Sequence, residues 1–261
     1  MSYVSPDPAF DSEALARGDL ALDIPALAKE ISWVEDGGKL PDTFLDAGKA
    51  KSQTIGITGS PGVGKSTLTS AIVKAIRKAG ELVAVLAVDP SSPITGGALL
   101  GDRIRMQEHY LDAGVYIRSM GSRGHLGGLA AATPQAIALV AHAGFTEIIV
   151  ETVGVGQSEV EVMNHVETTI VVLSPGAGDD IQSAKAGILE VADIFIINKI
   201  DRDLEGAQKL HQELIRSQEL SARHDGWRAP VVMTSALDRT GVTEVVTAIK
   251  KHQEFKRSAR G

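Results

Sequence analysis

The segment from Gly59 to Ser66 constrains this chain most, because it requires a strand before it and a helix after it. Its letters, GSPGVGKS, fit the pattern G-x-x-x-x-G-K-[ST]. The glycines let the backbone curl so that its N–H groups face phosphate oxygens. The apolar run QTIGITG precedes the segment, and a helical pattern follows it at 66–78. The helix would turn the positive end of its dipole toward the same anion. The segment therefore predicts a phosphate-binding loop.

Short apolar runs alternate with helical patterns along most of the chain. Strands this apolar are buried on both faces, as in a parallel sheet that helices cover. We therefore expect an α/β fold with a doubly wound, mostly parallel sheet, and a helical extension before it. The expected regions are the extension (1–52), a domain that contains the phosphate-binding loop (53–255) and a basic tail (256–261). The expected strands are 53–59, 81–89, 115–119, 146–152, 168–174, 192–198 and 229–235, and the expected helices after the extension are 66–78, 133–142, 157–165, 180–191, 203–219 and 242–255.

Composition narrows the classes of function. The net charge of −7 and an aromatic content of 4% argue against a nucleic-acid binder. The chain has no cysteine, so thiolate chemistry and thiolate zinc sites are excluded. No apolar run is long enough to span a membrane, and the acidic start of the chain is not a secretory signal. We expect a soluble, cytoplasmic protein without membrane or nucleic-acid partners.

The tetrad Asn198-Lys199-Ile200-Asp201 follows an apolar run and predicts guanine recognition. The Asp201 carboxylate can accept hydrogen bonds from the N1–H and 2-amino groups of guanine, which adenine lacks. The segment TSAL at 234–237 suits a backbone contact to the guanine oxygen. We expect GTP or GDP as ligand, in contact with Ser60, Pro61, Gly62, Val63, Gly64, Lys65, Ser66, Thr67, Asn198, Lys199, Asp201, Ser235, Ala236 and Leu237.

A magnesium ion is expected beside the phosphates. The Ser66 hydroxyl would bind it, and Asp89, Asp102 and Glu151 lie at strand ends or in a glycine-rich loop on the same edge. Each acid alone could equally be a helix cap or a loop ion pair. Lys65 would neutralise the β- and γ-phosphates, and Gln157 could orient water or simply begin a helix. The candidate catalytic residues are Lys65, Asp89, Asp102, Glu151 and Gln157, with Arg103, Arg105 and Arg123 as weaker candidates for a transition-state cation.

Two further glycine-rich loops follow apolar runs, VGVGQSE and SPGAGDDIQ. Such loops order with GTP and relax with GDP. The second could also be a simple turn with an Asp helix cap. The candidate switch residues are Gly154, Gly156, Gly176, Gly178, Asp179 and Asp180.

Together these motifs resemble the MeaB-like GTPase chaperones of adenosylcobalamin-dependent acyl-CoA mutases. The similarity covers roughly 25–250, and its specific blocks are DPSS…GGALLGDRIRM and ETVGVGQSE. It implies a SIMIBI-type P-loop GTPase that hydrolyses GTP slowly with Mg²⁺. It also implies a mutase partner, a cobalamin adenosyltransferase as second candidate partner, and a role in cofactor loading and in removal of damaged cofactor. The family's P-loop lysine corresponds to Lys65, its Mg²⁺-linked acids to Asp89, Asp102 and Glu151, and its third switch to 174–188.

Family members carry a longer C-terminal arm that dimerises, whereas this chain stops at Gly261. A homodimer would then need another face. Two other functions remain open from the residues: a GTPase that inserts metal into another metalloenzyme, and a P-loop kinase. The lack of cysteine and of clustered histidine opposes the first, and the NKID tetrad opposes the second.

Overall fold

A computed structural model describes residues 24–50, 52–89, 106–121, 128–152, 161–176, 191–220 and 225–260. Its seven strands are ordered β3-β2-β4-β1-β5-β6-β7 in one sheet. The pairs β2–β3, β1–β5, β5–β6 and β6–β7 are parallel. The doubly wound α/β fold and all seven expected strands are thereby confirmed. The strands are β1 (Gln53–Thr58), β2 (Val83–Asp89), β3 (Val115–Gly121), β4 (Glu147–Thr152), β5 (Thr168–Leu173), β6 (Ile194–Ile197) and β7 (Val231–Met233).

Most of the expected helices 157–165 and 180–191 lies outside the described residues, so those two stay predictions. The other described helices differ from expectation mainly at their ends. Helix α6 begins at Gly128 instead of at residue 133 and contains Pro134. Helix α11 runs to Arg260, so residues 256–260 continue it instead of forming a separate tail. No glycine or proline interrupts these last residues, and Lys, Arg and Ala favour helix. The helices are α2 (Ile24–Glu35), α3 (Asp42–Lys49), α4 (Lys65–Lys78), α6 (Gly128–His142), α10 (Leu204–Leu220) and α11 (Val242–Arg260), with a 3₁₀ turn η1 (Gln107–His109).

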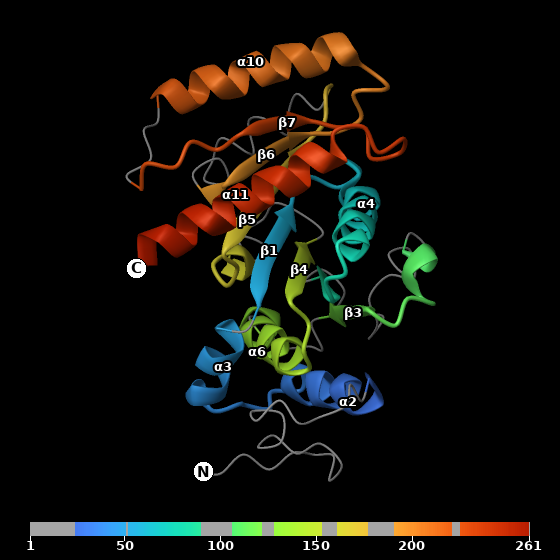
Figure 1. Ribbon diagram of the computed structural model, residues 1–261, viewed down its shortest axis with the longest axis vertical. Coiled ribbons are helices and arrows are strands. Elements are labelled where there is room, and N and C mark those ends of the chain that lie inside the picture. Colours follow the sequence, from blue (N-terminus) through green and yellow to red (C-terminus); the bar gives the residue numbers. More distant parts are fainter. Residues whose placement is uncertain are drawn as a thin grey trace. The chain divides into compact units, whose positions relative to one another are not determined.

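The chain divides into two compact units, one of residues 1–54 and 80–150 and one of 55–79 and 151–261. In the first unit, α2 and α3 lie beside α6 (Figure 1). The Gln135 side chain on α6 accepts a hydrogen bond from Leu40 N at 2.7 Å and donates to Gly38 O at 3.2 Å. His142 stacks on Phe44 with ring centroids 3.9 Å apart. The N-terminal helices therefore dock on α6 through defined polar and ring contacts.

A partly buried ion pair also holds α2 against β3 in the first unit. The Arg118 Nη2 atom lies 2.5 Å from Glu35 Oε2 and donates to Ser32 Oγ at 2.9 Å. Pairing in this way offsets the cost of removing both charges from water. The apolar side of α2 is buried through Leu27 and Ile31.

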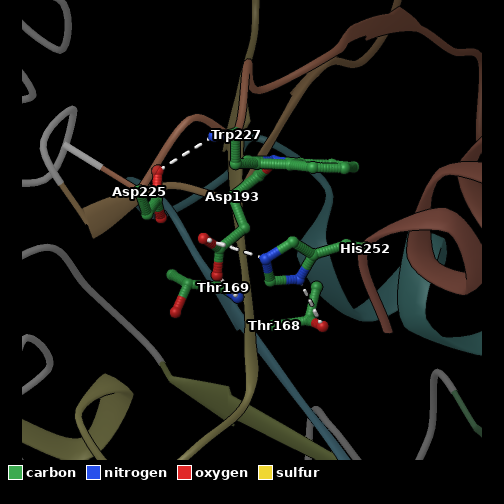
Figure 2. Close-up of polar contacts among 6 residues, drawn as sticks. All are labelled: Thr168, Thr169, Asp193, Asp225, Trp227 and His252. Atoms are coloured by element: carbon green, nitrogen blue, oxygen red, sulfur yellow. Dashed lines mark hydrogen bonds and ion pairs between the residues drawn. The ribbon is translucent and has the colours of Figure 1, made fainter. Parts of the chain in front are cut away.

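In the second unit, α10 packs on β5 and β6 around Leu210, Leu214 and Phe195. Helix α11 is joined to the sheet by a polar cluster at the start of β5 and just before β6 (Figure 2). His252 Nδ1 lies 2.9 Å from Thr168 Oγ1, and His252 Nε2 lies 3.4 Å from Asp193 Oδ1. The carboxylate also accepts from Thr169 N at 2.8 Å, and Trp227 Nε1 donates to the Asp193 carbonyl at 2.8 Å.

Among the helices that the structure describes, none is both long and apolar enough to cross a bilayer.

Candidate nucleotide-binding site

The loop from Gly59 to Gly64 depends on glycine for two different reasons. Gly59, Gly62 and Gly64 have φ angles of 147°, 84° and 97°, which disfavour other residues. A Cβ atom on Gly59 would also lie 2.2 Å from the backbone oxygen of Val172, in β5. One on Gly64 would lie 2.5 Å from Asn198 Nδ2. The sequence therefore permits the loop to pass close to β5 and to Asn198.

Lys65 and Ser66 begin helix α4, directly after the loop. The Lys65 ammonium donates hydrogen bonds to Gly59 O at 2.6 Å and Ser60 O at 3.0 Å. These carbonyls hold a buried positive charge at the N-terminus of the helix, where a phosphate would be attracted. The expected strand, loop and helix are therefore present, with Lys65 as the first residue of the helix.

The Ser66 hydroxyl donates a hydrogen bond of 2.6 Å to Glu151 Oε1, near the end of β4. Both side chains are buried. A hydroxyl and a carboxylate are hard oxygen donors of the kind that Mg²⁺ prefers, with its other positions filled by phosphates and water. The donor set thus fits Mg²⁺. Within the described ranges no three acidic or histidine side chains cluster as a complete protein-only metal site.

The side-chain contacts of the other expected metal ligands fall outside what the structure describes. Asp89 is the last residue of β2. Asp102 lies outside the described residues, as do Gln157, Arg103, Arg105 and Arg123. Of the candidate switch residues, Gly154, Gly156, Gly178, Asp179 and Asp180 are also outside. Gly176 is described and follows β5 in a turn, with φ of 82°. Their proposed roles remain predictions.

Asn198 joins the phosphate loop to the loop after β7. Its Nδ2 donates to Val63 O at 2.9 Å, and its Oδ1 accepts from Thr234 Oγ1 at 3.1 Å and Ala236 N at 3.0 Å. The side chain is buried. The structure shows this side chain holding two loops together, and its expected contact with the nucleotide stays a prediction. Thr234 was not among the expected site residues, although it opens the quoted TSAL segment.

The rest of the tetrad lies beside the same loops. Lys199 has φ of 65°, rare for a residue with a side chain, and its ammonium donates to Gly62 O. Asp201 is exposed, so its carboxylate can meet a ligand from solvent. Ile200 N donates to Thr234 O at 3.2 Å. The tetrad and the last loop are therefore joined by backbone as well as side-chain bonds.

The loop after β7 is closed locally. Ser235 N donates to Thr240 O at 3.1 Å, and Thr240 N donates to Asp238 Oδ1 at 2.9 Å. Hydrogen bonds from the Thr240 side chain, and then from its backbone, lower the pKa of Asp238. Leu237 is 80% exposed at this loop. The loop therefore presents an apolar side chain and backbone groups beside Asp201.

The fold and this arrangement define a P-loop nucleotide-binding protein of the GTPase class. The family model of the methylmalonyl Co-A mutase-associated GTPase MeaB matches residues 34–260. The chain belongs to this family.

Individual relatives agree with that membership. A Pyrococcus abyssi protein named as a GTPase is 53% identical over 210 residues, which are 79% of this chain and 64% of the relative. The GTPase ArgK of Escherichia coli is 42% identical over 197 residues, 75% of this chain and 60% of ArgK. The mouse mitochondrial methylmalonic aciduria type A homolog is 40% identical over 208 residues, 79% of this chain and 50% of the homolog. The chain thus spans between half and two thirds of these relatives.

Solved structures show the same architecture. The crystal structure of an LAO/AO transport system kinase has a TM-score of 0.69 and 30% identity, covering 95% of this chain and 75% of that one. HypB from Helicobacter pylori, in complex with nickel, has a TM-score of 0.59 and 18% identity, covering 86% of this chain and 95% of HypB. At that identity the likeness to HypB shows the fold alone.

Proposed function

We propose that this protein hydrolyses GTP to GDP and phosphate, and that it binds an adenosylcobalamin-dependent acyl-CoA mutase. Turnover of GTP would gate loading of the cofactor and removal of damaged cofactor. The match of residues 34–260 to a mutase-associated GTPase family carries this proposal. A cobalamin adenosyltransferase is a second candidate partner.

The geometry supports a nucleotide bound across the two joined loops. Backbone N–H groups of the phosphate loop and the start of α4 would surround the phosphates. Lys65, now held by Gly59 O and Ser60 O, would add positive charge there. Asp201 would accept the N1–H and 2-amino protons of guanine. The bond from Asn198 to Val63 would then fix the spacing between the proposed base and phosphate sites.

Ser66 and Glu151 would hold Mg²⁺, directly or through water, beside the β- and γ-phosphates. The ion would neutralise charge that develops on the phosphate oxygens. Asp89 and Asp102 are proposed as further ligands, and Gln157 as the residue that orients water.

GTP hydrolysis by the purified protein, alone and with the mutase from the same genome, tests the proposal. We expect the mutase to stimulate turnover at least about tenfold, which corresponds to about 1.4 kcal/mol of barrier lowering. Lys65→Ala should abolish the activity. If the mutase neither stimulates GTP hydrolysis nor forms a complex with the protein, the mutase is removed from the proposal. The protein would then be a GTPase with another partner.

Base recognition needs a separate test. Asp201→Asn should weaken the binding of GTP and favour the binding of xanthosine nucleotides, because an amide N–H₂ donor replaces one of the two carboxylate acceptor oxygens. Asp203→Asn is the matched control two residues away. Asp203 caps α10 by accepting from Gly206 N at 2.8 Å, and Asn caps equally well. An unchanged GTP preference in Asp201→Asn would contradict the guanine assignment.

A further inference from the structure

Two buried threonines meet where β1 and β4 end. Thr58 is the last residue of β1 and Thr152 the last of β4. The Thr152 hydroxyl donates a hydrogen bond of 3.0 Å to Thr58 Oγ1. Their side chains are 1% and 0% exposed. Neither residue was singled out by the motif analysis.

The hydroxyls are not needed for packing. Valine has nearly the same shape as threonine and suits a buried strand. Ile57, directly before Thr58, and Val150, two residues before Thr152, are both apolar. A buried hydroxyl costs free energy unless it is paired. A paired one fixes both distance and direction, and the β-branched side chains restrict χ1 further. The bond therefore sets the position of one strand end against the other.

Each threonine adjoins a group of the phosphate and metal site. Thr58 directly precedes Gly59, whose carbonyl accepts from the Lys65 ammonium. Thr152 directly follows Glu151, whose carboxylate accepts from Ser66 Oγ. Consecutive Cα atoms are only about 3.8 Å apart, so a shift at either threonine moves its neighbour. One hydrogen bond thus links the backbone before the phosphate loop to the backbone that carries the candidate metal ligand.

We propose that Thr58 and Thr152 are positioning residues that hold Glu151 and Ser66 in register for Mg²⁺ beside a bound nucleotide. This inference rests on the proposed nucleotide and Mg²⁺ site. Loss of the hydrogen bond between the threonines should therefore weaken the Mg²⁺-dependent retention of nucleotide and not the packing of the sheet. Neither threonine touches the nucleotide in this role.

Dissociation of fluorescent mant-GDP from the whole protein, with excess Mg²⁺ or with EDTA, provides the test. In the wild type Mg²⁺ should slow dissociation. Thr152→Val should reduce that slowing by about fivefold or more, the size of one buried hydrogen bond. The rate in EDTA should stay nearly unchanged. Thr152→Ser keeps the hydroxyl and should restore the Mg²⁺ effect.

Thr58→Val breaks the same bond from the other side, and it serves if Thr152→Val does not fold. The double variant should lose no more of the Mg²⁺ effect than either single variant. The effects of two substitutions that break the same contact do not add. Thr168→Val is the matched control. It removes a buried threonine hydroxyl that contacts His252, in the same unit, at the opposite end of the neighbouring strand β5. It should leave the Mg²⁺ effect intact.

The outcomes separate the two proposals. A wild-type Mg²⁺ effect that survives in both valine variants would overturn the positioning role and leave the proposed function standing. An equal loss in Thr168→Val would also overturn it, because any buried hydroxyl would then suffice. If the wild type binds no GDP, or releases it at the same rate with and without Mg²⁺, the proposed site and this inference are both overturned.

Discussion

Gly59 and Gly62 both lie in the phosphate loop but face different constraints. Gly62 has φ of 84° and open space where a Cβ atom would stand. Gly59 has φ of 147° and would place a Cβ atom 2.2 Å from Val172 O. A backbone atom of a buried strand cannot move aside cheaply. The two positions therefore separate backbone strain from a steric clash.

Gly59→Ala is expected to destabilise the protein by clearly more than Gly62→Ala. Gly62→Ala should cost about 1–2 kcal/mol, the strain of a left-handed residue. Gly59→Ala adds the clash with β5 and should also abolish mant-GDP binding. Urea unfolding and mant-GDP titration measure both effects. Equal losses of stability would show that the approach to Val172 is not limiting.

Tyr116 is a buried phenol in the first unit. Burial raises its pKa to about 12, while Arg118 lowers it and Glu35 raises it. Within the described part of the chain its hydroxyl has no hydrogen-bond partner. The folded state therefore keeps this proton to higher pH than the unfolded chain, whose pKa is near 10.

Tyr116→Phe should make the protein more resistant to alkali. Below pH 10 the phenol is protonated in both states, so its titration changes nothing. Between about pH 10 and 12 only the unfolded state ionises, and the wild-type free energy of unfolding falls. Between pH 8 and pH 11 the free energy of unfolding of the wild type should fall by about 1.4 kcal/mol more than that of Tyr116→Phe. Urea unfolding at both values checks this, with the half-exposed Tyr110→Phe as control. Parallel losses in wild type and Tyr116→Phe would contradict it.

Motif residues were predictable from sequence where the chemistry is local. The GSPGVGKS pattern placed Lys65 and Ser66 at the start of a helix, and the structure has them there. The partners of Asn198 were not predictable, because Val63 and Thr234 are distant in sequence and meet only through the sheet order. The Thr58–Thr152 pair was missed for the same reason. Its only local sign is a polar residue that ends an apolar run.

Strands were easier to locate than helix ends, because burial on both faces gives a continuous apolar signal. The Thr133-Pro134 pair reads locally as a cap and first helical residue, yet α6 begins before it. The sequence pattern did not predict helix α3 as a separate element. It has only 8 residues, and its place depends on contacts such as Phe44 with His142, which are far apart in sequence.

One buried carboxylate, that of Asp193, helps to join α11 to the sheet. Asp193 is buried and accepts from Thr169 N while facing His252 (Figure 2). Asp193→Ala should lower the free energy of unfolding by about 3 kcal/mol, because it leaves a buried N–H unpaired and breaks a buried pair. Urea unfolding followed by tryptophan fluorescence, to which Trp227 in this cluster and Trp33 both contribute, measures the loss.

Asp225→Ala is the control for that variant. Asp225 accepts from Trp227 N at 3.0 Å but is exposed, so its removal should cost less than about 1 kcal/mol. Similar losses in the two variants would show that burial of Asp193 does not matter. The helix would then depend on its apolar contacts instead.

At the scale of the whole molecule, the described groups of the candidate nucleotide site belong to one unit. The phosphate loop, Glu151, Asn198 and the loop after β7 all lie in 55–79 and 151–261. The N-terminal helices belong to the other unit, and their polar contacts to Gln135, His142 and Arg118 stay within it. A ligand that binds one set of loops lowers local opening there first.

Hydrogen exchange should therefore respond unevenly to nucleotide. With saturating GDP and Mg²⁺, amides of 60–66 and 234–237 should exchange at least about tenfold more slowly, which corresponds to about 1.4 kcal/mol of added local stability. Amides of α2 and α3 should exchange at their former rates. Lys65→Ala with the same GDP is the control, because it removes the charge that would hold the phosphates. Slower amide exchange in α2 and α3 that disappears in Lys65→Ala would contradict the prediction. The N-terminal helices would then respond to the bound nucleotide. Equal slowing in Lys65→Ala and wild type would instead mean that GDP binds elsewhere.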